Sequence, residues 1–212
     1  MANPTLTTKL EAINSMLSAI GQASVSALGT GADATMAEQI FDEVNIEVQN
    51  EGWKFNTHTV DLTADGGGHI DLDSNVARAD VPRKAISSTT GKLKDYVMLG
   101  DPSDSDQMKL YDLTNDTFAV TTAAGVLKDV ELVYLYDFIL LPEAVRNYIK
   151  IKATRIFQDR MVGSTKHARY TREDELRSRA RLQREQSEQG DFNVLNTYVG
   201  KILARPSPLD RI

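Results

Sequence analysis

The sequence predicts an α+β protein: an antiparallel helical bundle formed by the N- and C-terminal parts, with a small antiparallel β module inserted between them. Apolar residues near both ends of the chain recur at three- and four-residue spacing, as on one face of a helix. Through the middle they alternate with polar residues, as in strands with one buried face. We therefore assign residues 1–53 and 138–190 to the helical domain, 54–137 to the β domain and 191–212 to an extended tail.

The first helix is predicted over residues 7–20. Thr8 and Glu11 have the spacing of a capping box, in which each side chain accepts a hydrogen bond from the backbone N–H of the other residue. Gly21 follows the last apolar residue and ends the helix. The apolar residues on one face of this helix are Leu6, Leu10, Ile13, Leu17 and Ile20. This face predicts packing against the second helix as an antiparallel pair.

The second helix is predicted to begin near Ala34 or Thr35, where Thr35 and Glu38 repeat the capping-box spacing, and to run to Glu51. Gly52 supplies the left-handed conformation that commonly ends a helix. Trp53, the single tryptophan, lies where helical spacing changes to strand character, and Phe55 follows it. We predict that Gly52, Trp53 and Phe55 form a structural anchor. Trp53 would then be buried between helices and strands, and its replacement by alanine would be among the most damaging single changes.

The β module is predicted from turn residues that separate short alternating segments. The predicted hairpins join residues 60–62 to 70–72 through residues 65–68, residues 85–88 to 96–99 through Gly91, and residues 108–113 to 117–120 through Asn115 and Asp116. Residues 130–138 alternate as well, but both faces are apolar near the middle of the segment, which predicts a central strand. The module as a whole is predicted to be a sandwich or an open barrel.

Two helices of different character are predicted in the C-terminal part. Pro142 opens the third, which runs to about Val162 and ends at Gly163. The fourth, over residues 171–189, has too few apolar positions for a core-facing stripe. Its charges are spaced to pair at i and i+4: Glu173 with Arg177, Glu175 with Arg179, Arg181 with Glu185, and Arg184 with Glu188. Such a helix either bridges solvent or lies in a polar interface between subunits.

An interface with other subunits is predicted from this fourth helix and the tail. The residues assigned to it are Arg169, Arg172, Arg177, Arg179, Arg181, Arg184, Phe192, Leu195, Tyr198, Ile202 and Leu203. Residues 1–141 hold 9 Lys or Arg against 21 Asp or Glu, whereas residues 142–212 hold 15 against 9. A chain with oppositely charged ends can pack head to tail with its own copies. Two solvated surfaces of opposite charge explain the same counts equally well.

The sequence contains no motif for catalysis, metal binding or cofactor binding, and we predict that the protein is not an enzyme. Cysteine is absent, which excludes thiol nucleophiles and zinc–thiolate sites and suits a chain made in a reducing host cytoplasm. The three histidines have no metal-ligand spacing. Neither a signal peptide nor an apolar run long enough to span a membrane is visible, so no membrane partner is expected.

Three blocks, in this order along the chain, resemble the tail tubular protein A family of short-tailed bacteriophages. The matching positions are Asn14, Leu17, Ile20 and Gly21, then Gln49, Gly52, Trp53, Phe55 and Asn56, then Pro142, Ala153, Phe157, Gln158 and Arg160. The blocks cover about half the chain and are specific only in combination. Residues 59–137 and the tail after Asp191 resemble the family only in general character and not in motif, so the family's partner contacts cannot be transferred to them.

The resemblance implies a structural virion protein of the tail. It implies a dodecameric ring of this chain that acts as the adaptor between the portal protein and the tail nozzle, tail tubular protein B. The helices would face the portal and the β module would contribute to the surface that meets the nozzle, with tail fibres attached near that junction. Genomic DNA would pass through the ring without sequence-specific binding, and an acidic chain suits such a channel because phosphate binding depends on Lys and Arg.

Two other classes of function stay open from the residues themselves. A nucleic-acid-binding accessory protein could use the arginine-rich residues 169–184, although acidic residues interrupt them. A hydrolase acting on a cell-wall or capsular polymer would need a pair of carboxylates, and acidic residues are plentiful.

Overall fold

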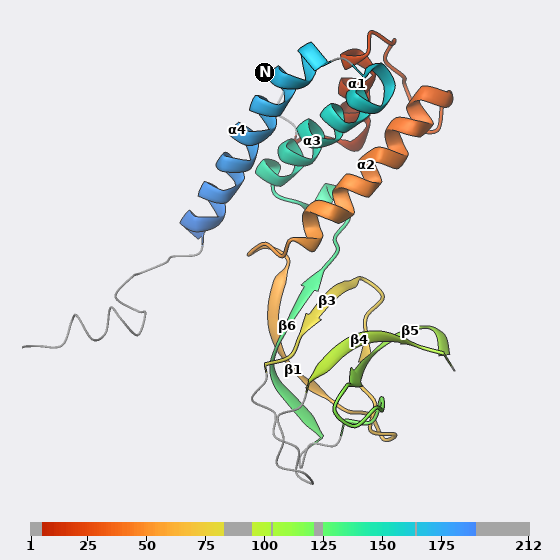
Figure 1. Cartoon of the computed structure of the whole chain (residues 1–212), viewed down its shortest axis with the longest axis vertical. Helices are drawn as coiled ribbons and strands as arrows, with labels where there is room; N and C mark the ends of the chain where they lie inside the picture. Colours follow the sequence, from red (N-terminus) through yellow and green to blue (C-terminus); the bar gives the residue numbers. More distant parts are fainter. Residues whose placement is uncertain (1–5, 83–94, 103, 121–124, 164, 190–212) are drawn as a thin grey trace, which may run out of the picture.

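The computed structural model describes residues 6–82, 95–102, 104–120, 125–163 and 165–189, without the side chains of residues 104–106, 165–171 and 189. Figure 1 shows a helical body above a β module. The helices are α1 (Lys9–Ala19), α2 (Ala32–Asn50), α3 (Glu143–Val162) and α4 (Thr165–Gln189), with a short 3-10 helix η1 (Phe138–Leu140) before α3. The strands are β1 (Thr57–Thr63), β2 (Asp71–Leu72), β3 (Val76–Asp80), β4 (Tyr96–Asp101), β5 (Asp104–Asp112) and β6 (Val126–Tyr134). The predicted α+β class is confirmed, while the predicted tail lies outside the described residues.

Two helices begin and end as their sequences predict. The capping box of α1 is present: Glu11 N–H donates to the Thr8 hydroxyl at 3.2 Å, and Thr8 N–H donates to the Glu11 carboxylate at 2.8 Å. The hydrogen bond from the Thr8 backbone, the largest effect on this carboxyl, lowers the pKa of Glu11. At the other end of the chain, α3 ends at Gly163, which has a left-handed φ of 62°.

The capping box predicted for the second helix is absent, and the helix begins two residues before Ala34. Helix α2 begins at Ala32 after Gly31, whose φ is 92°, and no side chain caps it. Thr35 therefore lies inside the first turn, where its hydroxyl donates to the Gly31 carbonyl at 2.9 Å. Glu38 accepts a hydrogen bond from Gly29 N–H at 2.5 Å instead of closing a capping box. The Glu38 carboxylate, which the sequence spacing assigned to the helix cap, thus binds the preceding loop instead.

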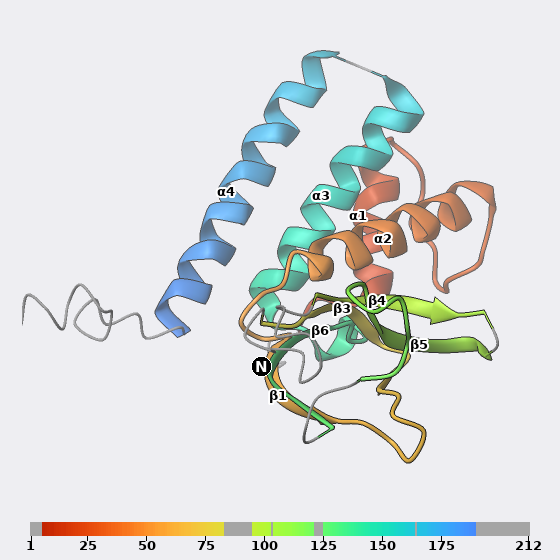
Figure 2. The same cartoon turned by 60° about the horizontal axis from the view of Figure 1, so that its bottom comes forward.

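The last helix begins six residues earlier than predicted, at Thr165 rather than residue 171. Helix α4 runs antiparallel to α3 along one side of the helical body (Figures 1 and 2). Among its described side chains, Ser178 and Leu182 are buried, whereas Leu176 is 61% exposed. The prediction of a helix with a minimal apolar contact surface is therefore confirmed, and this surface packs against α3.

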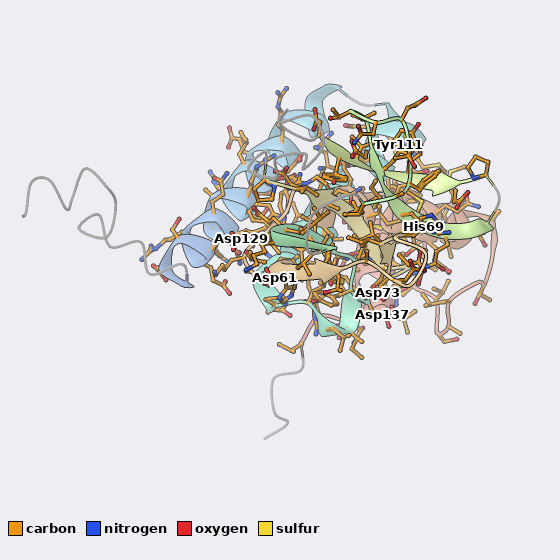
Figure 3. The ribbon with its side chains drawn as sticks, turned by 90° about the horizontal axis from the view of Figure 1, so that it is seen from below. Asp61, His69, Asp73, Tyr111, Asp129 and Asp137 are labelled. Carbon is orange, nitrogen blue, oxygen red and sulfur yellow. The ribbon has the colours of Figure 1, made fainter. Side chains whose placement is uncertain are left out.

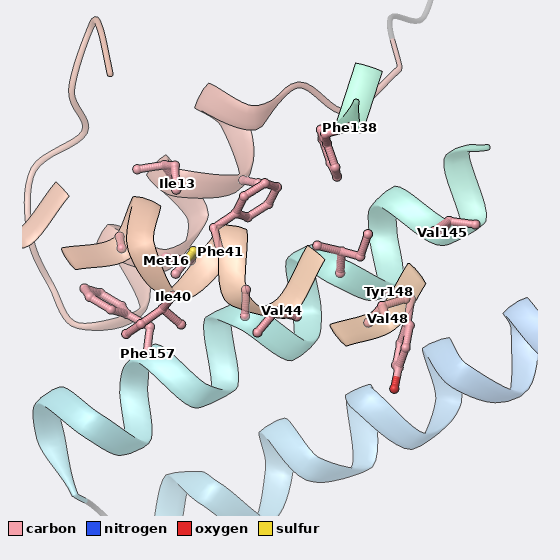
Figure 4. Close-up of a cluster of buried hydrophobic side chains, with 14 of the residues drawn as sticks. Ile13, Met16, Ile40, Phe41, Val44, Val48, Phe138, Val145, Tyr148 and Phe157 are labelled. Atoms are coloured by element: carbon pink, nitrogen blue, oxygen red, sulfur yellow. The ribbon is translucent and has the colours of Figure 1, made fainter. Parts of the chain in front are cut away.

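The two ends of the chain share one hydrophobic core. Figure 4 shows Phe41 and Val44 of α2, Ile13 and Met16 of α1, and the α3 side chains that meet them. The rings of Phe41 and Phe138 meet edge to face with centroids 4.9 Å apart. The buried residues of this core are Ala12, Ile13, Met16, Leu17, Ala34, Ala37, Ile40, Phe41, Val44, Val48, Phe138, Leu141, Val145, Tyr148, Ile149, Ala153, Phe157 and Leu182. Segments separated by the whole β module thus bury their apolar faces against one another.

The strands form two antiparallel three-stranded sheets, with orders β1-β6-β3 and β2-β5-β4. Strand β6 is central in the first sheet, as predicted, although it covers Val126–Tyr134 rather than residues 130–138. A second core lies within this module, and its buried residues are Ile70, Leu72, Val76, Tyr96, Leu110, Val120, Leu127, Val130 and Leu132. The described residues therefore contain two separate hydrophobic cores, one among the helices and one among the strands.

The hairpin predicted around residues 65–68 is wrong, although the turn itself is present. The Asp65 carboxylate accepts hydrogen bonds from the N–H groups of Gly67 and His69, at 2.9 and 2.7 Å. Strand β1 pairs with β6 and strand β2 with β5, so this turn carries the chain from one sheet to the other. A turn motif determines the local reversal but not which strand lies beside which.

The other two predicted hairpins have different outcomes. Residues 85–88 and Gly91 lie outside the described residues, and β4 pairs with β5 instead. The turn at Asn115 and Asp116 is present, but only a single bridge between Asp112 and Thr117 follows it rather than a strand pair. The prediction of paired strands over residues 117–120 is therefore wrong.

Trp53 is half-buried rather than enclosed, which corrects the prediction of a fully buried wedge. Its ring packs against the helical core, and its Nε1–H donates to the Val48 carbonyl at 2.7 Å. One side of the ring borders a groove beside α4. Trp53→Ala is accordingly expected to lower the free energy of unfolding by less than the roughly 3–5 kcal/mol typical of a fully buried aromatic residue.

Candidate assembly interface

The outward surface of α4 carries most of the arginines predicted to form an interface. Arg172, Arg177, Arg181 and Arg184 are exposed, while Arg179 is turned toward the body of the molecule, where it pairs with Glu51 at 2.9 Å. The side chain of Arg169 lies outside the described residues. The same holds for the predicted tail residues Phe192, Leu195, Tyr198, Ile202 and Leu203.

Only part of the predicted charge pairing along α4 is formed. Arg177 lies 3.5 Å from Glu173, and Arg184 lies 2.9 Å from Glu188. The predicted pair of Glu175 with Arg179 is absent, because each residue pairs with another helix. Glu175 accepts a hydrogen bond from Arg155 of α3, and Arg179 pairs with Glu51 at the C-terminal end of α2. Ion pairs with other helices thus help to attach α4, because its apolar contact with the helical body is small.

The opposite charges of the two halves are partly matched inside one molecule. Three acidic residues of α2, and Glu51 directly after it, each pair with a basic residue of another helix, at distances from 2.7 to 3.1 Å. These pairs are Asp42 with Lys9, Glu43 with Arg160, Glu47 with Lys152, and Glu51 with Arg179. Because most of these carboxylates are exposed, each pair contributes little stability, about 0–1 kcal/mol. Part of the opposite charge of the two halves is therefore neutralised within one molecule and is not available for contacts between copies.

A groove of about 410 Å³ lies along the seam between α3 and α4. Its wall is mostly apolar surface, supplied by Ile151 and by the aliphatic stems of charged side chains. Four basic side chains line it, Lys150, Arg155, Arg177 and Arg181, together with the single acid Asp174. Arg155 and Arg177 are paired with neighbouring carboxylates, whereas Lys150 and Arg181 make no ion pair with the described residues. Lys150 also interacts electrostatically with the exposed carboxylate of Glu11. The groove thus combines an apolar wall with positive charge that neighbouring carboxylates offset in part.

A second groove, of about 420 Å³, lies where α4 passes the predicted anchor. Gly52 and Trp53 line it on one side, with Gln186 of α4 on the other. Gln186 accepts a hydrogen bond from Lys54 N–H at 2.8 Å, which ties the C-terminal part of α4 to this turn. Phe55, the third residue of the predicted anchor, is partly buried and packs against the helical core. The structure brings all three anchor residues together at the junction of the two modules.

Two amide side chains at this junction join the helical body to the β module, and we refer to Gln49 and Asn56 as the amide seam. The Asn56 amide donates to the carbonyls of Gln49 and Tyr134, at 2.9 and 2.8 Å, and its oxygen accepts Trp53 N–H. Gln49 exchanges two hydrogen bonds with the backbone of Tyr136, at 3.0 and 2.8 Å. Both side chains are buried. Neither was predicted as a site residue, although both lie in the second block of the resemblance.

Arg146 is another residue that no sequence motif singles out. Its guanidinium is 4% exposed and donates to the carbonyls of Thr7, Ile139 and Leu141. It therefore fixes the start of α1, η1 and the start of α3 to one another. A buried arginine with carbonyl acceptors cannot be distinguished in the sequence from an exposed arginine on the same helix.

The described residues provide no cluster that could hold a metal ion. No group of three or more His, Asp or Glu side chains capable of holding a metal ion occurs among them. His58 lies 3.0 Å from the Tyr136 hydroxyl, and Asp101 pairs with Lys109 at 2.9 Å, so these titratable groups are occupied by structural contacts. Within the same residues, no helix is both long enough and apolar enough to cross a membrane.

Comparison with known proteins assigns the chain to a family. The family model described as tail tubular protein matches residues 10–192, which include all four helices and both sheets except for the first residue of α1. The chain belongs to the tail tubular protein family. It is therefore a structural protein of a bacteriophage tail, and it takes its place in the virion. No curated protein matches the chain.

The family match gives the geometry a context. In a tail tubular protein, the polar outer face of α4 and the grooves beside it are candidate surfaces for assembly. The amide seam and Arg146 belong instead to the internal framework, because their side chains are buried and hydrogen-bonded to the backbone of other segments of the chain.

Proposed function

We propose that this tail tubular protein is the adaptor of the tail: a ring of twelve copies between the portal protein and the nozzle formed by tail tubular protein B. The observation that carries this proposal is the family match over residues 10–192, which covers both modules. The ring acts by assembly, without turnover of a substrate. Tail fibres are anchored near its junction with the nozzle, and genomic DNA passes through its channel.

The distribution of charge supports a conduit rather than a DNA-binding site. Viewed from below, the β module presents the carboxylates of Asp61, Asp73 and Asp129 (Figure 3). Asp61 and Asp129 are neighbours, since the Asp129 N–H donates to the Asp61 carboxylate at 3.0 Å. Negative side chains do not hold phosphates, so DNA can move past such a surface without being retained.

The experiment that tests the adaptor function is mass measurement with electron microscopy, on the purified chain alone and after mixing with portal. Rings of twelve copies seated on the portal are expected. The free chain can be monomeric if the portal serves as the template for assembly. A chain that stays monomeric and unbound in the presence of portal would overturn the proposal.

A nucleic-acid-binding accessory function is the alternative, and the four exposed arginines of α4 are the observation in its favour. Glu173, Asp174 and Glu188 lie among these arginines and neutralise part of their charge. This alternative requires DNA affinity that falls steeply with added salt. An absence of binding in dilute salt, measured by fluorescence anisotropy with a duplex probe, would remove it.

A further inference from the structure

One corner of the helical body exposes aliphatic side chains on a rigid support. Ile139 and Leu140 of η1 are 70% and 69% exposed, although Phe138 beside them is buried in the helical core. The buried Arg146 binds the carbonyls of Ile139 and Leu141, so the corner is held in one conformation. We refer to residues 137–143 as the η1 corner.

Two carboxylates flank these exposed side chains. Asp137 precedes η1, is exposed, and makes no capping hydrogen bond with its side chain. Glu143 begins α3 and is also exposed, with its carboxylate hydrogen-bonded to Thr7 at 2.6 and 2.9 Å. The η1 corner is thus an aliphatic projection between two negative charges.

The groove between α3 and α4 is complementary to the η1 corner in apolar surface and charge. Its wall is mostly apolar, and Arg181 at its side makes no ion pair with a described carboxylate, while Lys150 has only the exposed Glu11 carboxylate as an electrostatic partner. An aliphatic projection flanked by carboxylates would cover the wall and add negative charge beside both cations. Burial of apolar surface stabilises such a contact, and the matched charges favour one orientation of it.

The groove cannot be filled by the η1 corner of the same molecule. Both lie on α3: the corner leads directly into its first residue, Glu143, and the groove uses residues from Asn147 to Arg155. Eight residues of helix, from Glu143 to Ile151, span about 12 Å. Because Arg146 and Phe138 fix the corner at its own end of the helix, an η1 corner that fills the groove has to belong to another molecule.

We infer that the η1 corner of one copy docks into the α3–α4 groove of the next copy. This inference rests on the proposed ring, and it names the surfaces that join neighbouring subunits. Since corner and groove are different surfaces, each copy offers one of each. Repetition of such a heterologous contact produces a ring when the rotation closes.

Cysteine cross-linking tests the inference, because the chain contains no cysteine of its own. The double variant Leu140→Cys with Thr154→Cys places one thiol on the corner and one in the groove. After assembly on portal and mild oxidation, a denaturing gel is expected to show a ladder that extends beyond two copies. The matched control, Leu113→Cys with Thr154→Cys, replaces the corner thiol by another exposed one in the β module, at a position 53% rather than 69% exposed, and should give no ladder.

Electron microscopy of the same samples separates the two proposals. Rings without a ladder would overturn the docking of corner into groove and leave the adaptor function intact. A ladder that stops at two copies would overturn the docking as well, because it indicates a two-fold contact. Absence of both rings and ladder would count against the adaptor function itself.

A charge exchange provides an independent measurement. Arg181→Glu places a carboxylate opposite Asp137 or Glu143 and should weaken the association of copies on the order of tenfold, as measured by the yield of rings at limiting protein concentration. Asp137→Lys added to Arg181→Glu should restore it. Equal yields for the single variant and the unaltered chain would overturn the inference.

Discussion

At the residue scale, a few side chains and one glycine determine how the helical body meets the β module. Gly52 has a φ of 77°, and a Cβ at this position would lie 2.8 Å from Arg78 Nη2 and 3.3 Å from Val133 Cγ2. The residue is therefore constrained twice, by its backbone conformation and by the strands packed against it. The sequence predicted the backbone constraint, because Gly52 ends a helix. The steric constraint depends on how β3 and β6 pack against it.

Gly52→Ala is expected to lower the free energy of unfolding by about 1–2 kcal/mol from the left-handed conformation alone, and further from the contact with Val133. Gly29→Ala is the matched control, since Gly29 has a φ of 74° but nothing within 4 Å of the added Cβ. Urea unfolding measures both variants. Equal losses would show that the close approach contributes nothing.

Tyr96 makes the stability of the β module sensitive to alkaline pH. Burial, with a smaller effect of Asp112, raises the pKa of Tyr96 to about 12. The unfolded chain releases this proton near pH 10 and so binds fewer protons than the folded chain above that pH. The contribution to stability is fully present below about pH 10 and is lost as the pH rises toward 12. The free energy of unfolding, measured across this pH range, should decline less steeply for Tyr96→Phe than for the unaltered chain. Identical slopes would contradict the assignment of this pH dependence to Tyr96.

At the element scale, α4 is the least firmly held helix among the described residues. It buries Leu182 and Ser178 against α3, and its other attachments are polar: Arg155 to Glu175, Arg179 to Glu51, and Lys54 to Gln186. A helix with few buried apolar contacts opens at lower free energy than the core around it. Such a helix is suited to adjust its position when neighbouring subunits assemble.

Leu182→Ala should therefore release α4 while the rest of the helical body stays folded. The deletion of a fully buried leucine side chain costs roughly 2–5 kcal/mol, which is large relative to the small contact of α4. Hydrogen exchange is expected to accelerate in α4 and to remain slow in α2. Leu176→Ala, at a position 61% exposed, should leave exchange in both helices unchanged. Uniform acceleration in both helices would show instead that α4 opens only with the whole domain.

At the scale of the whole molecule, the helical body and the β module have separate cores and are joined by the amide seam. The hydrogen bonds of Gln49 and Asn56 satisfy backbone groups at the point where the chain leaves one module and enters the other. These bonds hold the two modules in one relative orientation. A fixed orientation is what an adaptor needs if the two modules contact different partners.

Asn56→Ala is expected to destabilise the protein by about 1–3 kcal/mol, because it leaves the buried carbonyls of Gln49 and Tyr134 without their donor. It should also split thermal unfolding, observed by calorimetry, into separate transitions for the two modules. The matched control Asn50→Ala removes an exposed amide and should do neither. A single transition with unchanged cooperativity in Asn56→Ala would show that the seam does not couple the modules.

The sequence by itself determined the features that depend on neighbouring residues. The capping box of Thr8 and Glu11, the left-handed glycines that end α2 and α3, and the turn at Asp65 follow from local hydrogen bonds and backbone preference. It also determined that both ends of the chain are helical and that the middle is a β module, because apolar periodicity reports which face of each element is buried. The family, too, was recognisable from three short blocks.

Only the tertiary structure decided which elements meet. Strand β1 pairs with β6 across a large separation in sequence, Glu38 binds a loop rather than its own helix end, and Trp53 borders a groove instead of being enclosed. The partners of α2's acids and the exposure of Ile139 and Leu140 were likewise invisible in the sequence. The physical reason is the same in each case: a side chain's partner is set by the packing of distant segments into shared cores, and no local pattern encodes that packing.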